Sequence, residues 1–196
     1  MIASGDRQIQ LINSLLETHA TELRGITLHR QVIKLDELVN EIENNFQPFL
    51  KEAKAMFINQ ISPDLPAIDG DPLHLRRVYE NLISNALKYN RPGLRITLDA
   101  EVVHSPRLQQ KVYKSNVPYL LRCTVADNGI GMTQQQCDRL FDLYSRGRDQ
   151  RRSLSLGLGL YMCRQIITAH NGEIGVISSP GQGATFWFTL PIQIEA

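Results

Sequence analysis

The chain has few of the features that mark a secreted or metal-stabilised protein. Its three cysteines, Cys123, Cys137 and Cys163, lie far apart and form no Cys-x-x-Cys pair. An odd number of isolated cysteines favours neither a disulfide framework nor a zinc site. We therefore expect the protein to occupy a reducing, cytoplasmic environment.

Signals for membranes and nucleic acids are also lacking. No apolar run approaches the roughly 18 to 20 residues that span a bilayer, and the N-terminus has no apolar signal-peptide stretch. The 21 basic and 20 acidic side chains leave a net charge of +1, so no overall field attracts nucleic acid or an anionic membrane. We expect a soluble chain that binds neither, although a longer parent protein with a membrane anchor is compatible with this sequence.

The 196 residues suffice for one domain of ordinary size with an appendage. Near the N-terminus, apolar residues recur at steps of three and four, which predicts a helix with a seam for a partner. The sequence thus divides into residues 1–30, an appended helix with a linker, and residues 31–196, a globular domain. The seam residues are Ile9, Ile12, Leu16, Leu23 and Ile26, and His19 fills the gap between Leu16 and Leu23.

Within the globular domain, helical and alternating patterns follow one another. We expect a helix capped by Asp36 that reaches about Lys54 and buries Phe49, and a strand over 94–103 that buries Val102. This order favours an α/β fold, a two-layer α/β sandwich in which about three helices back one mixed, mostly antiparallel sheet. Further strands are expected at 27–35, on either side of 62–66, up to 127, at 173–178 and at 184–190, and further helices at 72–89, 134–141 and 157–170.

The predicted helix over 72–89 has two different faces. Its apolar residues recur with the helical period, whereas polar side chains occupy the opposite side. A polar stripe of this kind is expected to face a ligand or another element. The stripe consists of Arg77, Asn81, Asn85 and Lys88.

Five short motifs accompany that helix in a fixed order. Each of them alone has an ordinary structural explanation, such as a solvated helix face or a tight turn. Their combination decides the interpretation. In order they are Asn-x-x-x-Asn-x-x-Lys-Tyr at 81–89, Asp-Asn-Gly-Ile-Gly-Met at 127–132, Phe-Asp-Leu-Tyr at 141–144, Gly-Leu-Gly-Leu at 157–160 and Gly-Gln-Gly-Ala-Thr at 181–185.

With these motifs, residues 33–190 resemble the catalytic domain of sensor histidine kinases. That family lies within a superfamily that also includes type II topoisomerase ATPase subunits, MutL-like repair proteins and large heat-shock chaperones. The resemblance implies a Bergerat-type ATP-binding fold with ATP and Mg²⁺ as ligands. Residues 7–30 also resemble the second helix of the dimerisation and phosphotransfer domain that precedes such a catalytic domain.

The resemblance assigns the polar stripe to the phosphates and the metal. Asn85 matches the family's magnesium ligand, and one neutral amide oxygen is sufficient for an ion that keeps several waters. Lys88 is placed to neutralise phosphate oxygens. Asn81 matches the first asparagine of the family's motif and supports the same network, so Asn81 and Lys88 are the implied catalytic residues. Tyr89 and Arg77 are weaker candidates at the edge of the pocket.

The second motif is implied to hold the base. The carboxylate of Asp127 can accept a hydrogen bond from the exocyclic amine of adenine, whereas guanine offers a carbonyl at that edge. Gly129 and Gly131 let the backbone approach the base. Met132 and Tyr144 are expected to form apolar walls, together with Phe141 and Leu143, although a core role for Phe141 is an equal alternative.

The last two motifs are implied to contact the polyphosphate and the base. Gly157 and Gly159 open a helix whose free amides meet phosphate, with Leu158 and Leu160 between and after them. Thr185 is expected to face the adenine. Where the family has a glycine followed by serine or threonine, this chain has Ser155 and Leu156, and the arginine-rich run at 146–152 is expected to form a lid over ATP.

The choice between ATP chemistries depends on Asn81. Hydrolysing members of the superfamily have a glutamate general base there, and an asparagine cannot take a proton from water. The resemblance therefore implies transfer of the γ-phosphoryl group to a histidine of the chain's own dimerisation domain in a homodimer, and onward to a response regulator receiver domain. Two alternatives stay open, an ATP hydrolase that uses Glu80 and a regulatory module that only binds nucleotide.

No histidine of the chain has the context of a phosphoacceptor. The family's acceptor is followed by Glu or Asp on the first dimerisation helix, whereas His19 precedes Ala20 in the apolar seam. We expect the acceptor upstream, in a longer protein.

Overall fold

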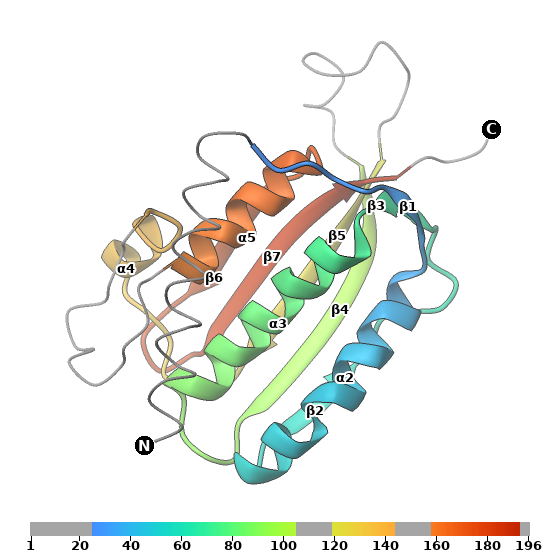
Figure 1. Cartoon of the computed structure of the whole chain (residues 1–196). Coiled ribbons are helices and arrows are strands. Elements are labelled where there is room, and N and C mark those ends of the chain that lie inside the picture. Colours follow the sequence, from blue (N-terminus) through green and yellow to red (C-terminus); the bar gives the residue numbers. More distant parts are fainter. Residues whose placement is uncertain (1–24, 105–118, 144–157, 193–196) are drawn as a thin grey trace, which may run out of the picture.

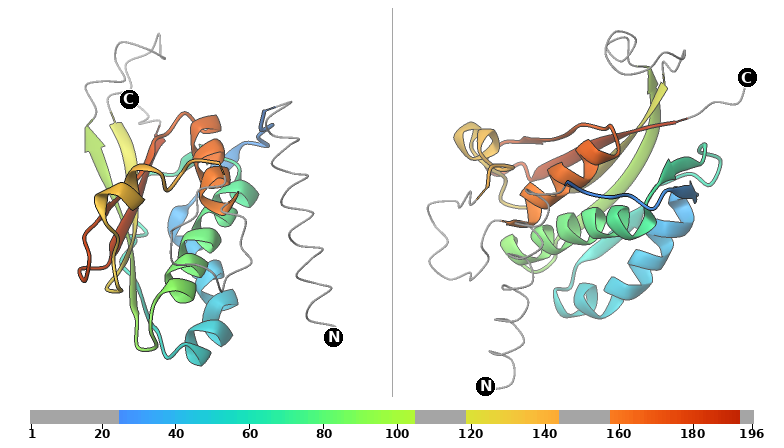
Figure 2. Two further views of the ribbon diagram at one scale, coloured as in Figure 1. Left: turned by 90° about the vertical axis from the view of Figure 1, so that its left-hand side faces the viewer. Right: turned by 45° about the horizontal axis from the view of Figure 1, so that its top comes forward.

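A computed structural model describes residues 25–104, 119–143 and 158–192 of the chain. One layer is a five-stranded sheet, and the other consists of three helices on one face of that sheet (Figures 1 and 2). The two-layer α/β sandwich predicted above is thereby confirmed. The three helices are α2 (Leu35–Glu52), α3 (Pro72–Tyr89) and α5 (Leu158–Ala169). Within the described ranges, no helix has both the length and the apolar character to cross a bilayer.

The sheet is mixed and mostly antiparallel, as expected. Its strand order is β2-β4-β5-β7-β6, and only the β2–β4 pair is parallel. A separate antiparallel pair, β1 with β3, lies beside the main sheet. The strands are β1 (Gln31–Ile33), β2 (Met56–Asn59), β3 (Ile68–Gly70), β4 (Arg95–His104), β5 (Tyr119–Asp127), β6 (Ile174–Ser178) and β7 (Ala184–Pro191), and a short helix α4 (Gln134–Asp138) follows β5.

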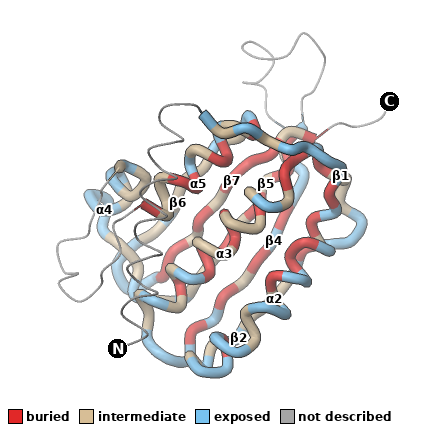
Figure 3. Tube along the Cα trace, in the orientation of Figure 1, coloured by how far each residue is buried: buried red, intermediate tan, exposed pale blue. Residues whose placement is uncertain are grey.

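The core lies between the sheet and the helices. Alternate residues of β4 and β5 are buried there because successive strand side chains point to opposite faces. Tyr79 of α3 meets Phe188 of β7 edge to face, with ring centroids 5.3 Å apart. Figure 3 shows these buried positions along the inner sides of the helices and strands. Val102 is an exception to the prediction: it is 41% exposed, because the end of β4 runs beyond the helices (Figure 1).

Helix α2 differs in two details from the prediction. It begins at Leu35, and its N-cap, Lys34, makes no side-chain capping bond; Asp36 lies in the first turn, where its charge still complements the helix dipole. Phe49 is 57% exposed, whereas its neighbour Leu50 is buried. Consecutive helical residues are rotated by about 100°, so only one of the two can face the core.

The strand predicted over 27–35 is limited to the three residues of β1. Its partner β3 is equally short, so no further backbone pairing is available. The preceding linker attaches through a side chain instead: the Arg30 guanidinium donates to the backbone oxygens of Asp69 and Ala169, at 2.9 and 3.3 Å. The predicted dimerisation helix lies outside the described residues, and the division at residue 30 stays a prediction.

Helix α3, which carries the polar stripe, begins at a buried aspartate. The carboxylate of Asp71 caps the helix by accepting from the backbone amides of Leu73 and His74. It also accepts from the amide of His29 at 2.8 Å and lies 2.9 Å from the His74 ring nitrogen Nδ1. Burial alone would raise the pKa of Asp71, but these hydrogen bonds outweigh burial and lower the pKa to about 2.

This lowered pKa predicts a loss of stability in acid. The folded state holds the Asp71 proton less tightly than the unfolded state, whose pKa is about 3.8, so the contribution is present above that pH and disappears as the pH falls toward 2. We expect about 2 kcal/mol of unfolding free energy to be lost over that range through this group. Urea unfolding between pH 5 and pH 2 measures it.

Asp71→Asn is expected to remove most of that pH dependence. The matched control is Asp64→Asn, because Asp64 is exposed. An identical acid dependence in the wild type and in Asp71→Asn would contradict the assignment.

Candidate functional site

Asn81 of the polar stripe faces α5. The side-chain amide of Asn81 donates to the backbone oxygen of Gly159 in the first turn of α5, at 3.2 Å. A Cβ atom at Gly159 would lie 2.3 Å from Oδ1 of Asn81. A methyl group at this position would displace the Asn81 amide, so the first and fourth motifs of the sequence lie side by side.

Asn85 and Lys88 follow on the same stripe. Asn85 is half-buried, and in the part of the chain that the structure describes its amide makes no hydrogen bond. Lys88 is exposed, with its ammonium 5.0 Å from the centre of the Tyr89 ring. An amide oxygen and a flexible cation are thus presented one helical turn apart, an arrangement suited to a phosphate chain and its counterion.

Asp127 ends β5 on the face of the sheet that the helices cover. Its Oδ1 accepts from the backbone amide of Gly129 at 2.8 Å and from the side-chain amide of Asn90 at 3.2 Å. Burial raises the pKa of this carboxyl above its usual value, while these two hydrogen bonds and one from the amide of Ala184 act in the opposite direction. The carboxylate is half-buried and held in one orientation, as base recognition requires.

Asn90 is a site residue that the sequence interpretation missed. In the sequence, Asn90 only follows the predicted helix over 72–89, and it is indeed the C-cap of α3. Its side chain also reaches Asp127 and the backbone amide of Ile130. A polar residue directly after the motif Lys88-Tyr89 was the available signal, but nothing in its spacing pointed to residues forty positions away.

The loop after Asp127 is locked to the hairpin between β6 and β7. Gly131 has φ +66°, and a Cβ there would lie 1.9 Å from the backbone oxygen of Ser179. The amide of Met132 donates to the Ser178 hydroxyl at 2.9 Å, and that hydroxyl donates to the backbone oxygen of Gly183. The second and fifth motifs therefore form one interlocked unit.

Thr185 does not face the pocket side of the sheet. Asp127 pairs with Ala184, so these two share the inner face, whereas Thr185 pairs with Ala126 on the outer face. A shift of one residue along a strand exchanges the two faces. The expectation that Thr185 faces the adenine is therefore corrected, and buried Ala184 takes the inner position.

The apolar candidates divide between core and pocket edge. Phe141 packs on Phe186 with centroids 6.5 Å apart, which supports its core alternative. Leu158 is buried at the start of α5, while Leu160 and Met132 are half-buried against the core. Tyr144 and Gly157 lie outside the described residues, as do Ser155, Leu156 and the predicted lid.

The side chains at the site suit a magnesium ion that is held mainly by the phosphate oxygens of a bound nucleotide and by water. In the described ranges no three His, Cys, Asp or Glu side chains gather into a metal cluster. Magnesium keeps most of its waters and needs few protein ligands when phosphate oxygens are present. The single amide oxygen of Asn85 fits that role.

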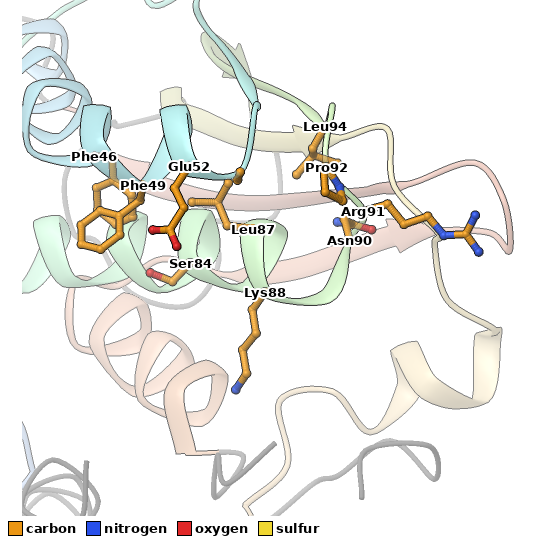
Figure 4. A pocket seen from close by; sticks show the side chains of 11 residues that line it. Phe46, Phe49, Glu52, Ser84, Leu87, Lys88, Asn90, Arg91, Pro92 and Leu94 are labelled. Atoms are coloured by element: carbon orange, nitrogen blue, oxygen red, sulfur yellow. The ribbon is translucent and has the colours of Figure 1, made fainter. Parts of the chain in front are cut away.

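A groove of about 510 Å³ lies on the other side of α3, against α2. Figure 4 shows Phe46, Phe49 and Glu52 of α2 opposite Ser84 and Leu87 of α3, with the Lys88 side chain pointing away from the phenylalanines. Asn81, Asn85 and Asp127 do not line it. Lys88 and Asn90 do line it, so the groove adjoins the candidate nucleotide site at the C-terminal end of α3.

Comparisons with known proteins agree with this geometry. The family model described as histidine kinase-, DNA gyrase B- and HSP90-like ATPase matches residues 70–194. The adaptive-response sensory kinase SasA of Crocosphaera subtropica is 34% identical over 183 residues, which cover 93% of this chain and 44% of the kinase. The chain thus spans less than half the length of that relative.

Two solved structures are similar in fold. Full-length ShkA in complex with AMPPNP superposes with a TM-score of 0.80 at 25% identity, covering 99% of this chain and 38% of ShkA. The histidine kinase ThkA in complex with the response regulator TrrA gives 0.71 at 18% identity, covering 98% of this chain and 49% of ThkA. With Gly159 and Asp127 both held by side chains at α3 and a family model matching most of the chain, the protein belongs to the histidine kinase-, DNA gyrase B- and HSP90-like ATPases and carries their ATP-binding domain.

Proposed function

We propose that this chain is the catalytic part of a sensor histidine kinase, which transfers the γ-phosphoryl group of ATP to a histidine on a dimerisation domain. The proposal rests chiefly on Asn81. The Asn81 side chain lies against Gly159. Hydrolysing relatives have a general base at the position of Asn81, and an amide cannot accept a proton from water. Phosphoryl transfer to a histidine requires positioning and charge neutralisation rather than such a base.

The position of Glu80 weakens the hydrolase alternative. Four residues before it, Arg76 forms an ion pair with Glu41 of α2, and four residues after it, Ser84 lines the groove against α2. Residues four apart share one side of a helix. Glu80 therefore belongs to the α2 side of α3, whereas Asn81 faces α5.

Each site residue then has a defined task. Asp127 accepts from the adenine amine, and the polar stripe receives the phosphates through Lys88, with Asn85 as the protein ligand of magnesium. Bound magnesium supplies charge neutralisation between the phosphate oxygens. The N-terminal end of α5 adds the positive end of its helix dipole beside Asn81.

We further propose a cytoplasmic homodimer that passes the phosphoryl group to a response regulator receiver domain. The ThkA–TrrA complex supports this partner by similarity of fold, and SasA by its name as a sensory kinase. Neither nucleic acid nor a membrane is proposed as a partner of these residues.

Transfer of labelled phosphate tests the kinase assignment. The chain is incubated with γ-labelled ATP, magnesium and a separate polypeptide that carries the dimerisation domain, with Asn85→Ala as the inactive control. An acid-labile label on the acceptor histidine is expected. Nucleotide binding without transfer would favour a regulatory module instead, and release of inorganic phosphate without an acceptor would favour a hydrolase.

A further inference from the structure

We infer that Asn90 is a positioning residue for base selectivity: its amide orients the Asp127 carboxylate that reads the adenine. This inference rests on the proposed role of Asp127. Asn90 itself is not proposed to touch the nucleotide. It acts by tying the end of α3 to the loop that follows β5.

Three hydrogen bonds place the Asn90 side chain. Its Nδ2 donates to the backbone oxygen of Ala86 at 2.9 Å and to Oδ1 of Asp127 at 3.2 Å. Its Oδ1 accepts from the backbone amide of Ile130 at 2.9 Å. Both ends of the amide are therefore in use, and the side chain has one orientation only.

The backbone of Asn90 makes this reach possible. As the C-cap of α3 it leaves the helical conformation, with φ −111° and ψ 172°. The chain direction changes here, while the side chain turns back to the last helical turn. The Asn90 side chain thus gives a hydrogen bond to the backbone oxygen of Ala86, which would otherwise lack a partner at the helix end. It also reaches Asp127, 37 positions further along the chain.

Gly129 is matched to this side chain. A Cβ at Gly129 would lie 1.7 Å from Oδ1 of Asn90, and its backbone amide donates to the same Asp127 oxygen at 2.8 Å. The glycine therefore leaves the space that the Asn90 amide fills. The Asn90 side-chain amide and the Gly129 backbone amide both donate to Oδ1 of Asp127.

Few other side chains can take the place of Asn90. Aspartate has the same shape and can still accept from Ile130, but it has no hydrogen to donate and sets a second negative charge beside Asp127. Alanine removes all three bonds. Without a donor from α3, the Asp127 carboxylate can rotate. Its distance from the polar stripe of α3 is then no longer fixed.

Nucleotide selectivity tests the inference. Affinities for ADP and GDP are measured by calorimetry without magnesium, so that the base contact dominates the comparison. For Asn90→Ala we expect ADP affinity to fall about tenfold and GDP affinity to fall about threefold or less, with a larger ADP loss for Asn90→Asp. The matched control Asn40→Ala removes an exposed amide on α2 and is expected to leave both affinities unchanged.

A purely structural role would lower both affinities by the same factor, because a damaged fold does not distinguish bases. Equal losses, or no loss, would overturn the inference. If Asn90→Ala does not fold, Gly129→Ala provides the second variant: its methyl group displaces the Asn90 amide and should narrow the ADP to GDP ratio in the same way.

The result also separates this inference from the proposed function. A wild-type chain that binds neither nucleotide contradicts ATP binding itself. A wild-type chain that prefers ADP, with the same preference in both Asn90 variants, contradicts only the role of Asn90. A wild-type chain without any base preference removes the role of Asp127 and the inference with it.

Discussion

Asp127→Asn is expected to weaken the preference for adenine over guanine nucleotides and to turn it toward guanine. The surroundings of the side chain decide the direction. Oδ1 of Asp127 accepts from the amide of Gly129 and from Nδ2 of Asn90, so an amide at this position must keep its oxygen toward those two donors. Its NH₂ group then takes the place of the other carboxylate oxygen and faces the base.

The consequence for binding follows from hydrogen-bond polarity. The adenine amine would meet another donor, whereas the guanine carbonyl would meet a suitable one. Loss of a charge-assisted bond together with an unpaired donor is expected to reduce ADP affinity about a hundredfold. Parallel titrations with ADP and GDP measure the change.

The control for this experiment is Asp99→Asn, an exposed carboxylate on β4. It changes the net charge by the same amount without approaching Asp127. Unchanged discrimination in Asp127→Asn would show that the carboxylate does not read the base. A parallel loss of ADP and GDP affinity would instead indicate damage to the loop that Gly129 and Asn90 hold.

Asn85→Ala is expected to abolish the gain in ATP affinity that magnesium provides. The half-buried amide makes no hydrogen bond with the rest of the described chain, so its removal should leave the fold intact. Without it, the ion would be held by phosphate and water alone. Titration of a non-hydrolysable ATP analogue with magnesium and with a chelator should give different affinities for the wild type and equal ones for the variant.

We expect magnesium to raise the affinity of the wild type for the ATP analogue about tenfold to a hundredfold, and this increase to be absent in Asn85→Ala. That is the range for one polar contact to a charged group. Ser84→Ala is the matched control, because Ser84 precedes Asn85 on the same helix but lines the groove against α2. The variant and its control should have the same melting temperature. A magnesium-dependent gain that persists in Asn85→Ala would remove this residue from the metal site.

Local patterns were sufficient for much of the fold. The helical period predicted a helix over 72–89, and the structure has α3 at Pro72–Tyr89 with Asp71 as its N-cap. Alternation predicted the inner positions of β4 and β5 up to the point where β4 leaves the helical layer. These signals are reliable because the helical period and strand alternation depend on residues only a few positions apart.

Predictions of which face a residue occupies were less secure. Phe49 and Thr185 both stand next to a residue that took the expected buried position, Leu50 in the helix and Ala184 in the strand. A neighbouring residue on a helix is rotated by about 100°, and on a strand by about 180°. An error of one position in sequence is therefore enough to remove a side chain from the site.

The sequence by itself determined the family, the α/β layers and the polar stripe of α3, because motif order and periodicity are properties of the linear chain. Only the tertiary structure decided that Asn81 meets Gly159, that Glu80 belongs to the α2 side and that Asn90 holds Asp127. These contacts join residues 37 and 78 positions apart. Their formation depends on how the helices and the sheet pack, and no local pattern encodes that packing.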